Sequence, residues 1–504
     1  MDATGLKSGP RAVFGALWVV LAITCVAVGL LTFPARAEVR FERMEVTLDH
    51  PVTGWLHGDI DRDGDSDLLL LHQRERIGAP THTATFIRQH PTGRYDFPGR
   101  QVFGLQDSGG VYELADVAAG GLLELVQVSR TGVRYFELAG DHFDTVPKVL
   151  FQPTHQPELP VISEPRAWDC GWQIFATGKE SVVIPFLDQL EIWTADQSAL
   201  YSLAHTFSSL TLDDQTSGGT GAAFTYALPN VLGGVHPGDL ELFACAGHRW
   251  HGFRRSGLDK ADFESYVSFG CQASDPIPFT GLGAQFDAGA RMADLNNDGA
   301  LDIVRWQNPG SLNQTRYEAE IYFGPIRAGL PRTPHARVSV EGVAGFPEFG
   351  DLNGDGRLDM VVCALEVAPL ATAKVFVMKK VKLYLLAFRQ RPDNSFSVVP
   401  DARLDFDYRV DFDDPSPMTG PLVRVVGDLD GNRTDDLVVQ TGEDQLAIYA
   451  GDAGRLLQDS PQHLECDGAI AIDTPDLDGD GRADIFLIHG SPRSAQRITA
   501  LLTR

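Results

Sequence analysis

Residues 59–71 read DIDRDGDSDLLLL. Aspartates occupy alternate positions at the start of this stretch, Gly64 follows them, and Asp67 leads directly into four leucines. Oxygen side chains at alternate positions of a tight loop can all turn inward, which suits Ca²⁺ because this ion takes about 6 to 8 oxygen ligands. Glycine has no Cβ and adopts the backbone angles that such a turn requires. The stretch therefore predicts a metal-binding loop that opens into a buried strand.

The same pattern recurs four more times along the chain. We call the five copies acidic loops 1 to 5, and they span residues 59–67, 294–302, 351–359, 428–436 and 476–484. Their candidate metal ligands are Asp59, Asp61, Asp63, Asp67, Asp294, Asn296, Asp298, Asp302, Asp351, Asn353, Asp355, Asp359, Asp428, Asp430, Asn432, Asp436, Asp476, Asp478, Asp480 and Asp484. Loop 4 alone departs from the pattern, with Arg433 at the glycine position. One acidic turn often binds nothing, but five copies with matched spacing are not expected by chance.

An apolar run follows each loop and is expected to form a buried strand. These runs lie at residues 68–71, 303–306, 360–363, 437–439 and 485–488. Acidic loops that lead into apolar strands resemble FG-GAP/VCBS repeats, which occur in the integrin α chain and in many secreted bacterial proteins. The resemblance implies a β-propeller with about five structural Ca²⁺ ions, each bound between the first two strands of a blade. The Phe-Gly and Gly-Ala-Pro signatures are poorly kept here, so the resemblance implies no ligand specificity.

Three further segments extend the repeat count. Residues 116–124 form a degenerate copy with Asp116, Gly121 and Glu124, whereas residues 189–193 and 239–243 each follow a polar turn and are expected to be strands. Eight such positions fit four-stranded units of about 40 to 50 residues plus insertions. We therefore expect an all-β chain in which residues 38–504 form one β-propeller domain. Seven or eight four-stranded blades are possible, and the count favours eight.

Neither end of this domain contains a complete blade. Residues 40–48 are therefore predicted to form the outer strand of the blade whose inner strands lie near residues 470–503. Such a clasp would leave no free sheet edge between the first and last blades, and free edges invite pairing with other chains.

The first 37 residues have the pattern of an export signal. Lys7 and Arg11 precede an uncharged stretch at residues 12–33, and Ala35 and Ala37 provide the small residues that a signal peptidase requires. The stretch is also long enough to span a bilayer, so residues 1–37 are either a cleaved signal peptide or an uncleaved anchor. Export to a periplasmic, extracellular or cell-surface location is expected, with membrane contact only if the segment is retained.

The charge balance excludes one class of partner. The formal net charge is −26 at pH 7, and five divalent ions would reduce it to −16. Nucleic acid is therefore not an expected partner, because its binding requires a basic face. Extracellular calcium is abundant enough to fill weak sites of this kind.

The sequence predicts no catalytic residue. It contains no nucleophile elbow, no HExxH zinc motif and no phosphate-binding loop. A carboxylate bound to Ca²⁺ stays ionised and has no proton to donate. The leading hypothesis is an exported, non-enzymatic propeller that serves as a binding, adhesion or scaffold module for a protein or glycan. The alternative is a polysaccharide-active enzyme of the lyase type built on a Ca²⁺ propeller.

Overall fold

The computed structural model describes residues 38–504 with internal gaps. The gaps are residues 75–80, 98, 106–109, 154–165, 168–170, 173–178, 186–188, 209–238, 247–248, 257–262, 271–288, 309–315, 327–328, 366–379, 410–421, 443, 467 and 491–496. The predicted leader, residues 1–37, lies outside the described part. The chain divides into two units, Met1–Val39 and Arg40–Arg504, and the second is the subject below. No helix long and apolar enough to cross a membrane occurs among the described residues.

The described residues form eight sheets of three to five strands, here called sheets 1 to 8. Sheet 1 contains β2 (Val52–Gly58), β3 (Asp67–Arg74), β4 (Thr81–Ile87) and β7 (Gln101–Leu105). Sheet 2 contains β8 (Val111–Ala115), β9 (Glu124–Ser129), β10 (Gly132–Phe136), β13 (Lys148–Phe151) and β14 (Arg166–Ala167). Sheet 3 contains β15 (Gly171–Trp172), β16 (Ser181–Pro185), β17 (Gln189–Ala195) and β18 (Tyr201–Ser208). Sheet 4 contains β19 (Asp239–Ala246), β20 (Arg249–Ser256) and β21 (Glu264–Gly270).

The second half of the chain repeats this plan. Sheet 5 contains β22 (Gly289–Ala293), β23 (Asp302–Gln307), β24 (Arg316–Tyr322) and β25 (Ala336–Glu341). Sheet 6 contains β26 (Val343–Ala344), β27 (Glu348–Gly350), β28 (Asp359–Leu365), β29 (Lys380–Phe388) and β30 (Ala402–Arg409). Sheet 7 contains β31 (Val423–Val426), β32 (Asp436–Gly442), β33 (Gln445–Tyr449) and β36 (Gln462–Glu465). Sheet 8 contains β37 (Ala469–Asp473), β38 (Ile485–His489), β39 (Arg497–Thr503) and β1 (Phe41–Thr47).

Three small hairpins supplement the sheets. They are β5 (Gln89–His90) with β6 (Arg94–Tyr95), β11 (Leu138–Ala139) with β12 (His142–Phe143), and β34 (Gly451–Asp452) with β35 (Leu456–Leu457). Each hairpin comes directly after the third strand of its sheet, in sheets 1, 2 and 7.

The four leucines after acidic loop 1, residues 68–71, explain how the sheets stack. Successive strand residues point to opposite faces of a sheet. Leu68 and Leu70 pack into a core cluster with Phe486 of sheet 8. Leu69 and Leu71 pack into a different cluster with residues of sheet 2. Strand β3 is therefore buried on both faces, which is why its sequence is continuously apolar rather than alternating.

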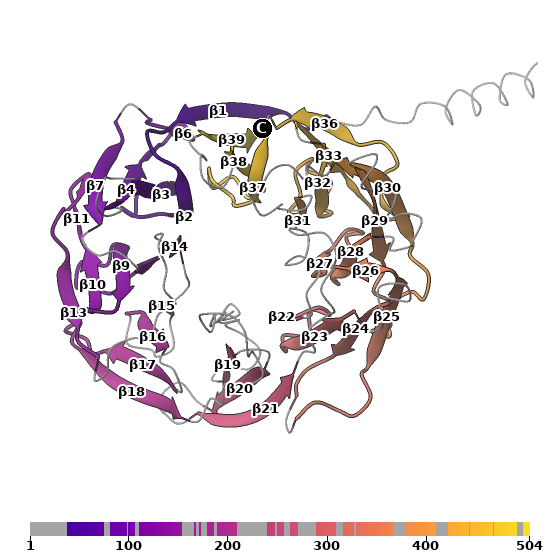
Figure 1. Ribbon diagram of the computed structural model, residues 1–504, viewed down its shortest axis with the longest axis horizontal. Helices are drawn as coiled ribbons and strands as arrows, with labels where there is room; N and C mark the ends of the chain where they lie inside the picture. Colours follow the sequence, from indigo (N-terminus) through magenta and orange to yellow (C-terminus); the bar gives the residue numbers. More distant parts are fainter. Residues whose placement is uncertain are drawn as a thin grey trace, which may run out of the picture. The chain divides into compact units, whose positions relative to one another are not determined.

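The same face-to-face packing links other consecutive sheets. Shared core clusters join sheets 2 and 3, sheets 4 and 5, sheets 5 and 6, and sheets 6 and 7. Figure 1 shows the sheets of Arg40–Arg504 following one another around a common centre, with β13, β18 and β21 on the outside. Successive antiparallel sheets stacked in this way define a β-propeller.

The predicted clasp is confirmed. Strand β1 pairs antiparallel with β39, from Phe41 opposite Thr503 to Thr47 opposite Arg497. The first strand of the chain thus completes the last sheet, and Val46 lies in the core cluster shared by sheets 8 and 1. This pairing covers the edge of β39 that would otherwise be free.

The five strands predicted after the acidic loops are also confirmed, as β3, β23, β28, β32 and β38. One predicted repeat position is displaced. Residues 189–193 belong to β17, the third strand of sheet 3, and β16 occupies the second place. The apolar run Val182, Val183 and Ile184 is fully buried and is the true counterpart of the leucine run in β3.

Candidate metal centre

Each acidic loop connects the first strand of a sheet to the second, where β26 and β27, which both pair with β28, together count as the first strand of sheet 6. Loops 1, 2, 4 and 5 follow β2, β22, β31 and β37, and loop 3 follows β27. The loops contain all twenty candidate ligands from the sequence, and every one of them lies in the described part of the chain. Because the sheets stack around one centre, the loops are presented at equivalent places in five sheets.

The first aspartate of each loop fixes the turn. In all five loops its carboxylate accepts a hydrogen bond from the backbone N–H of the sixth residue. The donors are Gly64 (3.2 Å), Gly299 (2.8 Å), Gly356 (2.8 Å), Arg433 (2.7 Å) and Gly481 (3.0 Å). The sixth residue has a positive φ in every loop, between 70° and 96°. That conformation explains the glycine preference, and Arg433 adopts it without being glycine.

The fifth residue fixes the exit from the turn. Its side-chain oxygen accepts a hydrogen bond from the N–H of the seventh residue in all five loops. The acceptors are Asp63 (3.0 Å), Asp298 (2.8 Å), Asp355 (3.0 Å), Asn432 (2.7 Å) and Asp480 (2.9 Å). The loops thus share one hydrogen-bonding scheme despite their different sequences.

The ninth aspartate ties the loop to the third strand of its sheet. It accepts a hydrogen bond from a backbone N–H at or just beyond the end of that strand. The pairs are Asp67 with Gln89 (2.9 Å), Asp302 with Gly324 (2.7 Å), Asp359 with Gln390 (2.9 Å), Asp436 with Gly451 (2.9 Å) and Asp484 with Thr503 (2.7 Å). In loops 2, 4 and 5 it also accepts the N–H of the second loop residue. One carboxylate therefore joins the loop, the second strand and the third.

All five ninth aspartates are completely buried. Burial raises the pKa of Asp67, Asp302, Asp359 and Asp436 to about 7, and that of Asp484 to about 6. Backbone hydrogen bonds lower these pKa values in part, and the neighbouring aspartates of the same loop raise them further. The loops therefore concentrate negative charge that a cation would offset.

In three loops, three carboxylates converge closely enough to share a cation. Their oxygens lie within 4.8 Å of one another in the groups Asp59, Asp61 and Asp63; Asp428, Asp430 and Asp436; and Asp476, Asp478 and Asp484. Loops 2 and 3 have asparagine at the third position instead. The amide nitrogens of Asn296 and Asn353 contact Asp298 (3.0 Å) and Asp359 (2.8 Å). Rotation of either amide group would place its oxygen where the third-position carboxylate oxygen lies in loops 1, 4 and 5.

Two buried carboxylate oxygens indicate that these residues fit a cation. Asp59 Oδ1 and Asp478 Oδ1 are buried and accept no hydrogen bond from the residues that the structure describes. A buried anionic oxygen without a partner is costly unless a cation satisfies it. The donor set consists of carboxylate and amide oxygens, which are the ligands that Ca²⁺ and Mg²⁺ prefer. The residues present therefore fit an oxygen-ligated divalent ion.

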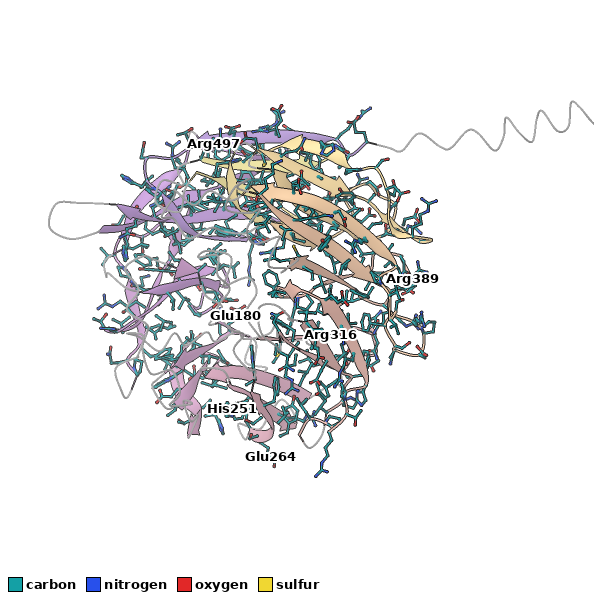
Figure 2. All side chains as sticks on the ribbon, turned by 45° about the vertical axis from the view of Figure 1, so that its right-hand side comes forward. Glu180, His251, Glu264, Arg316, Arg389 and Arg497 are labelled. Carbon is teal, nitrogen blue, oxygen red and sulfur yellow. The ribbon has the colours of Figure 1, made fainter. Side chains whose placement is uncertain are left out.

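The sequence did not reveal that arginines reach the third position of loops 1 and 5. Arg88 forms an ion pair with Asp61, and Arg504 forms one with Asp478. Each arginine directly follows the third strand of its sheet, so a basic residue at that place would have been the signal. Arg389 (Figure 2) directly follows β29 in sheet 6, as Arg88 and Arg504 follow the third strands of their sheets. The third position of loop 3 is Asn353, however, and Arg389 donates to the carbonyl of Gly454 at 2.9 Å.

A second charged cluster spans sheets 5, 6 and 7. Glu348 of β27 accepts a hydrogen bond from Arg424 of β31 (3.2 Å) and forms an ion pair with Arg291 of β22 (3.6 Å). The guanidinium groups lie over the rings of Phe346 and Phe349. Among the described residues, Arg424 donates through Nη1 to Glu348 and to the Val423 carbonyl, and Arg291 donates through Nη1 to the Pro347 carbonyl. The two arginine side chains are 37% and 43% exposed, respectively. Partly exposed guanidinium groups are able to bind carboxylates in a bidentate manner.

No family model and no curated protein matches this chain. Several solved structures are similar to it over most of its length. A lectin from Agrocybe aegerita, described as recognising non-reducing terminal N-acetylglucosamine, is 14% identical over 89% of this chain and 98% of its own, with a TM-score of 0.38. The Dos1 propeller is 9% identical over 92% and 95%, with a TM-score of 0.42. The Nup133 β-propeller domain of Vanderwaltozyma polyspora is 9% identical over 93% and 99%, with a TM-score of 0.38. Similarity at this level does not extend to function.

Proposed function

We propose that this chain is an exported, calcium-stabilised β-propeller of eight blades that acts as a non-enzymatic binding or scaffold module for a protein or glycan. The observation that carries the proposal is the shared geometry of the five acidic loops. Each holds its first, fifth and ninth side chains by the same backbone hydrogen bonds, and loops 1 and 5 leave buried carboxylate oxygens without partners among the described residues. This arrangement resembles that of FG-GAP/VCBS repeats, and each of the eight sheets would be one blade.

The calcium would serve a structural purpose. In each loop the first, third, fifth and ninth side chains would hold the ion, which supplies positive charge among carboxylates that otherwise repel one another. Because the ninth aspartate already joins the loop to two strands, an ion bound there would stiffen the connection among three strands of a blade. A rigid propeller would then present its remaining loops to a partner. Extracellular calcium would keep such sites filled after export.

The test begins with the metal content. Protein dialysed into millimolar calcium is expected to retain about five calcium ions per chain by elemental analysis. Asp298→Ala and Asp480→Ala should each remove one ion and lower the melting temperature much more in calcium than in chelator. Asp459→Ala is the matched control, because Asp459 is exposed and lies outside the loops. Absence of bound metal, or equal melting of loop variants and parent in both buffers, would overturn the proposal.

A glycan array would then identify or exclude a sugar partner.

One observation favours a second candidate function. The partly exposed guanidinium groups of Arg291 and Arg424 could neutralise the carboxylate of a uronic acid, as a polysaccharide lyase requires. Incubation with acidic polysaccharides should then generate unsaturated product, and an Arg291→Ala/Arg424→Ala variant should generate none. If the parent yields no such product across a panel of acidic polysaccharides, the lyase alternative is wrong and the binding module stands.

A further inference from the structure

Residues 116–124, the degenerate copy, keep the backbone of an acidic loop. Gly121 at the sixth position has a φ of 74°, within the range of the five acidic loops. Glu124 at the ninth position accepts the N–H of Val117 at 2.9 Å, as the ninth aspartates of loops 2, 4 and 5 accept the N–H of their second residues. Leu123 donates its N–H to the carbonyl of Ile60 in loop 1. Leu358 of loop 3 makes the same bond to Leu295 of loop 2.

The oxygen ligands of this loop, by contrast, are reduced to two. The third and fifth positions are Ala118 and Gly120, which have no side-chain oxygen. Of the two carboxylates that remain, Glu124 already accepts the N–H groups of Val117 and Ala118 through one oxygen. A divalent ion would therefore find far fewer than the about 6 oxygens that Ca²⁺ requires.

Side-chain cations from two neighbouring sheets contact the first aspartate instead. Lys179 Nζ binds Asp116 Oδ1, and Arg62 Nη2 binds Asp116 Oδ2 at 3.0 Å. Lys179 comes from the segment before β16 of sheet 3, and its side chain is only 13% exposed. Arg62 belongs to acidic loop 1, and its guanidinium lies 3.2 Å from where a Cβ on Gly121 would be. Two carboxylates and two side-chain cations therefore meet at this loop.

We propose that the Lys179 ammonium takes the place of a divalent ion in loop 116–124, so that this sixth loop has a built-in cation and binds no metal. The comparison with loops 1 to 5 rests on the proposed function. The assignment of the cation rests only on the contacts of Asp116. An ammonium suits a reduced site because it needs only about three acceptors, and a buried lysine is stable when it is paired.

The contacts of Lys179 and its neighbours connect three sheets. The N–H of Glu180, the next residue, donates to the Asp116 carbonyl at 3.0 Å, and Tyr201 of β18 donates to the Glu180 carbonyl at 2.6 Å. Figure 2 shows Glu180 on the side of sheets 2 and 3 that faces the centre. At this loop, sheets 1, 2 and 3 are therefore linked by charges that chelation does not remove, whereas the cation of each acidic loop in sheets 1 and 5 to 8 would be a metal ion.

The first experiment compares Lys179→Met with Lys148→Met. Lys148 also pairs with a carboxylate, Glu137, in the same part of the fold, but about half of its side chain is exposed. Lys179→Met is expected to lower the melting temperature by several degrees, because it leaves Asp116 buried with fewer partners. The shift should be the same in calcium and in chelator, and Lys148→Met should change melting little. A Lys179→Met shift no larger than that of the control would overturn the proposal.

The second experiment converts the loop into a metal site. Ala118→Asp and Gly120→Asp restore the missing oxygens in the Lys179→Met background, and a Cβ at Gly120 would meet no atom within 4 Å. The triple variant is expected to bind one more calcium per chain than the parent and to regain stability in calcium. If the triple variant folds but binds no additional calcium, the Lys179 ammonium does not occupy the place of a metal ion, and the proposal is wrong. If the parent itself binds no calcium, the proposed function is wrong, and the Lys179→Met comparison alone still decides this inference.

Discussion

Asp351 and Asp435 exchange two hydrogen bonds between adjacent sheets. The N–H of Asp351 donates to Asp435 Oδ2 at 2.7 Å, and the N–H of Asp435 donates to the Asp351 carbonyl at 2.9 Å. Asp351 is the first residue of acidic loop 3, and Asp435 is the eighth residue of acidic loop 4. The loops are therefore bonded to one another as well as to their own sheets. Displacement of loop 3 should therefore also displace loop 4.

This contact gives the first prediction. Asp435→Ala should lower the free energy of unfolding by about 1 to 3 kcal/mol, because it leaves the N–H of Asp351 without its acceptor. The measurement is denaturant unfolding in calcium. Asp435→Asn is the matched control, since its amide oxygen can still accept that hydrogen bond. Equal losses for the two variants would show that the charge of Asp435, and not the bond between loops, is what stabilises the contact.

The second prediction concerns the one acidic loop without glycine at its sixth position. Arg433 has a φ of 70°, and an L-residue in the left-handed region costs about 1 to 2 kcal/mol. Arg433→Gly removes this strain, although glycine loses more backbone entropy on folding. The net result should be a gain of about 0.5 to 1 kcal/mol in unfolding free energy.

Arg433→Ala separates the backbone effect from the side chain. It removes the exposed guanidinium but keeps the Cβ, so it should give no gain. If alanine stabilises the protein as much as glycine does, the arginine side chain and not the backbone conformation is unfavourable.

The sequence alone was sufficient to predict those parts of the fold that the repeat encodes. The loops, the strands after them and the β1–β39 clasp follow from alternating aspartates, apolar runs and the incomplete ends of the chain. The sequence did not predict contacts between residues far apart along the chain, such as Arg504 with Asp478 or Lys179 with Asp116. The pairing of Lys179 with Asp116 depends on how neighbouring sheets stack, and that of Arg504 with Asp478 depends on how the strands of sheet 8 pair. No local sequence pattern records either arrangement. Residues 189–193 were misplaced by one strand for a related reason, because in sheet 3 no acidic loop marks the second strand.

The third prediction uses a buried histidine of β3. Burial lowers the pKa of His72 to about 4, and the contact of its Nδ1 with the His50 carbonyl at 3.2 Å offsets this only in part. The pKa of histidine in the unfolded chain is near 6.5. The unfolded chain therefore takes up the proton first, and stability that is present above pH 6.5 is lost as the pH falls toward 4.

A pKa change from 6.5 to about 4 corresponds to roughly 3 kcal/mol. His72→Leu should remove that part of the acid destabilisation, so the difference in unfolding free energy between variant and parent should grow in favour of the variant between pH 6.5 and 4. His90→Leu is the control, because His90 is exposed. A constant difference across this pH range for His72→Leu would show that His72 does not titrate on unfolding.

The fourth prediction concerns the competition between protons and metal at the acidic loops. In the metal-free chain, burial raises the pKa of Asp302 and Asp436 to about 7, above the ordinary 3.8. A raised pKa in the folded state means that protonation favours the folded chain at low pH, and that this contribution is lost as the pH rises through 7. Calcium requires the ionised carboxylates, so it must displace those protons.

The increase in melting temperature on adding calcium should therefore be large at pH 8 and should shrink steadily toward pH 5. Taking the difference between calcium and chelator at each pH cancels the contribution of His72, which is the same in both buffers. Calcium titrations at fixed pH should likewise give an apparent affinity that falls as the pH falls below 7. An increase in melting temperature that is equal at pH 8 and pH 5 would mean that the ninth aspartates are not ligands of the ion, and that the cation binds through the exposed side chains of the loops alone.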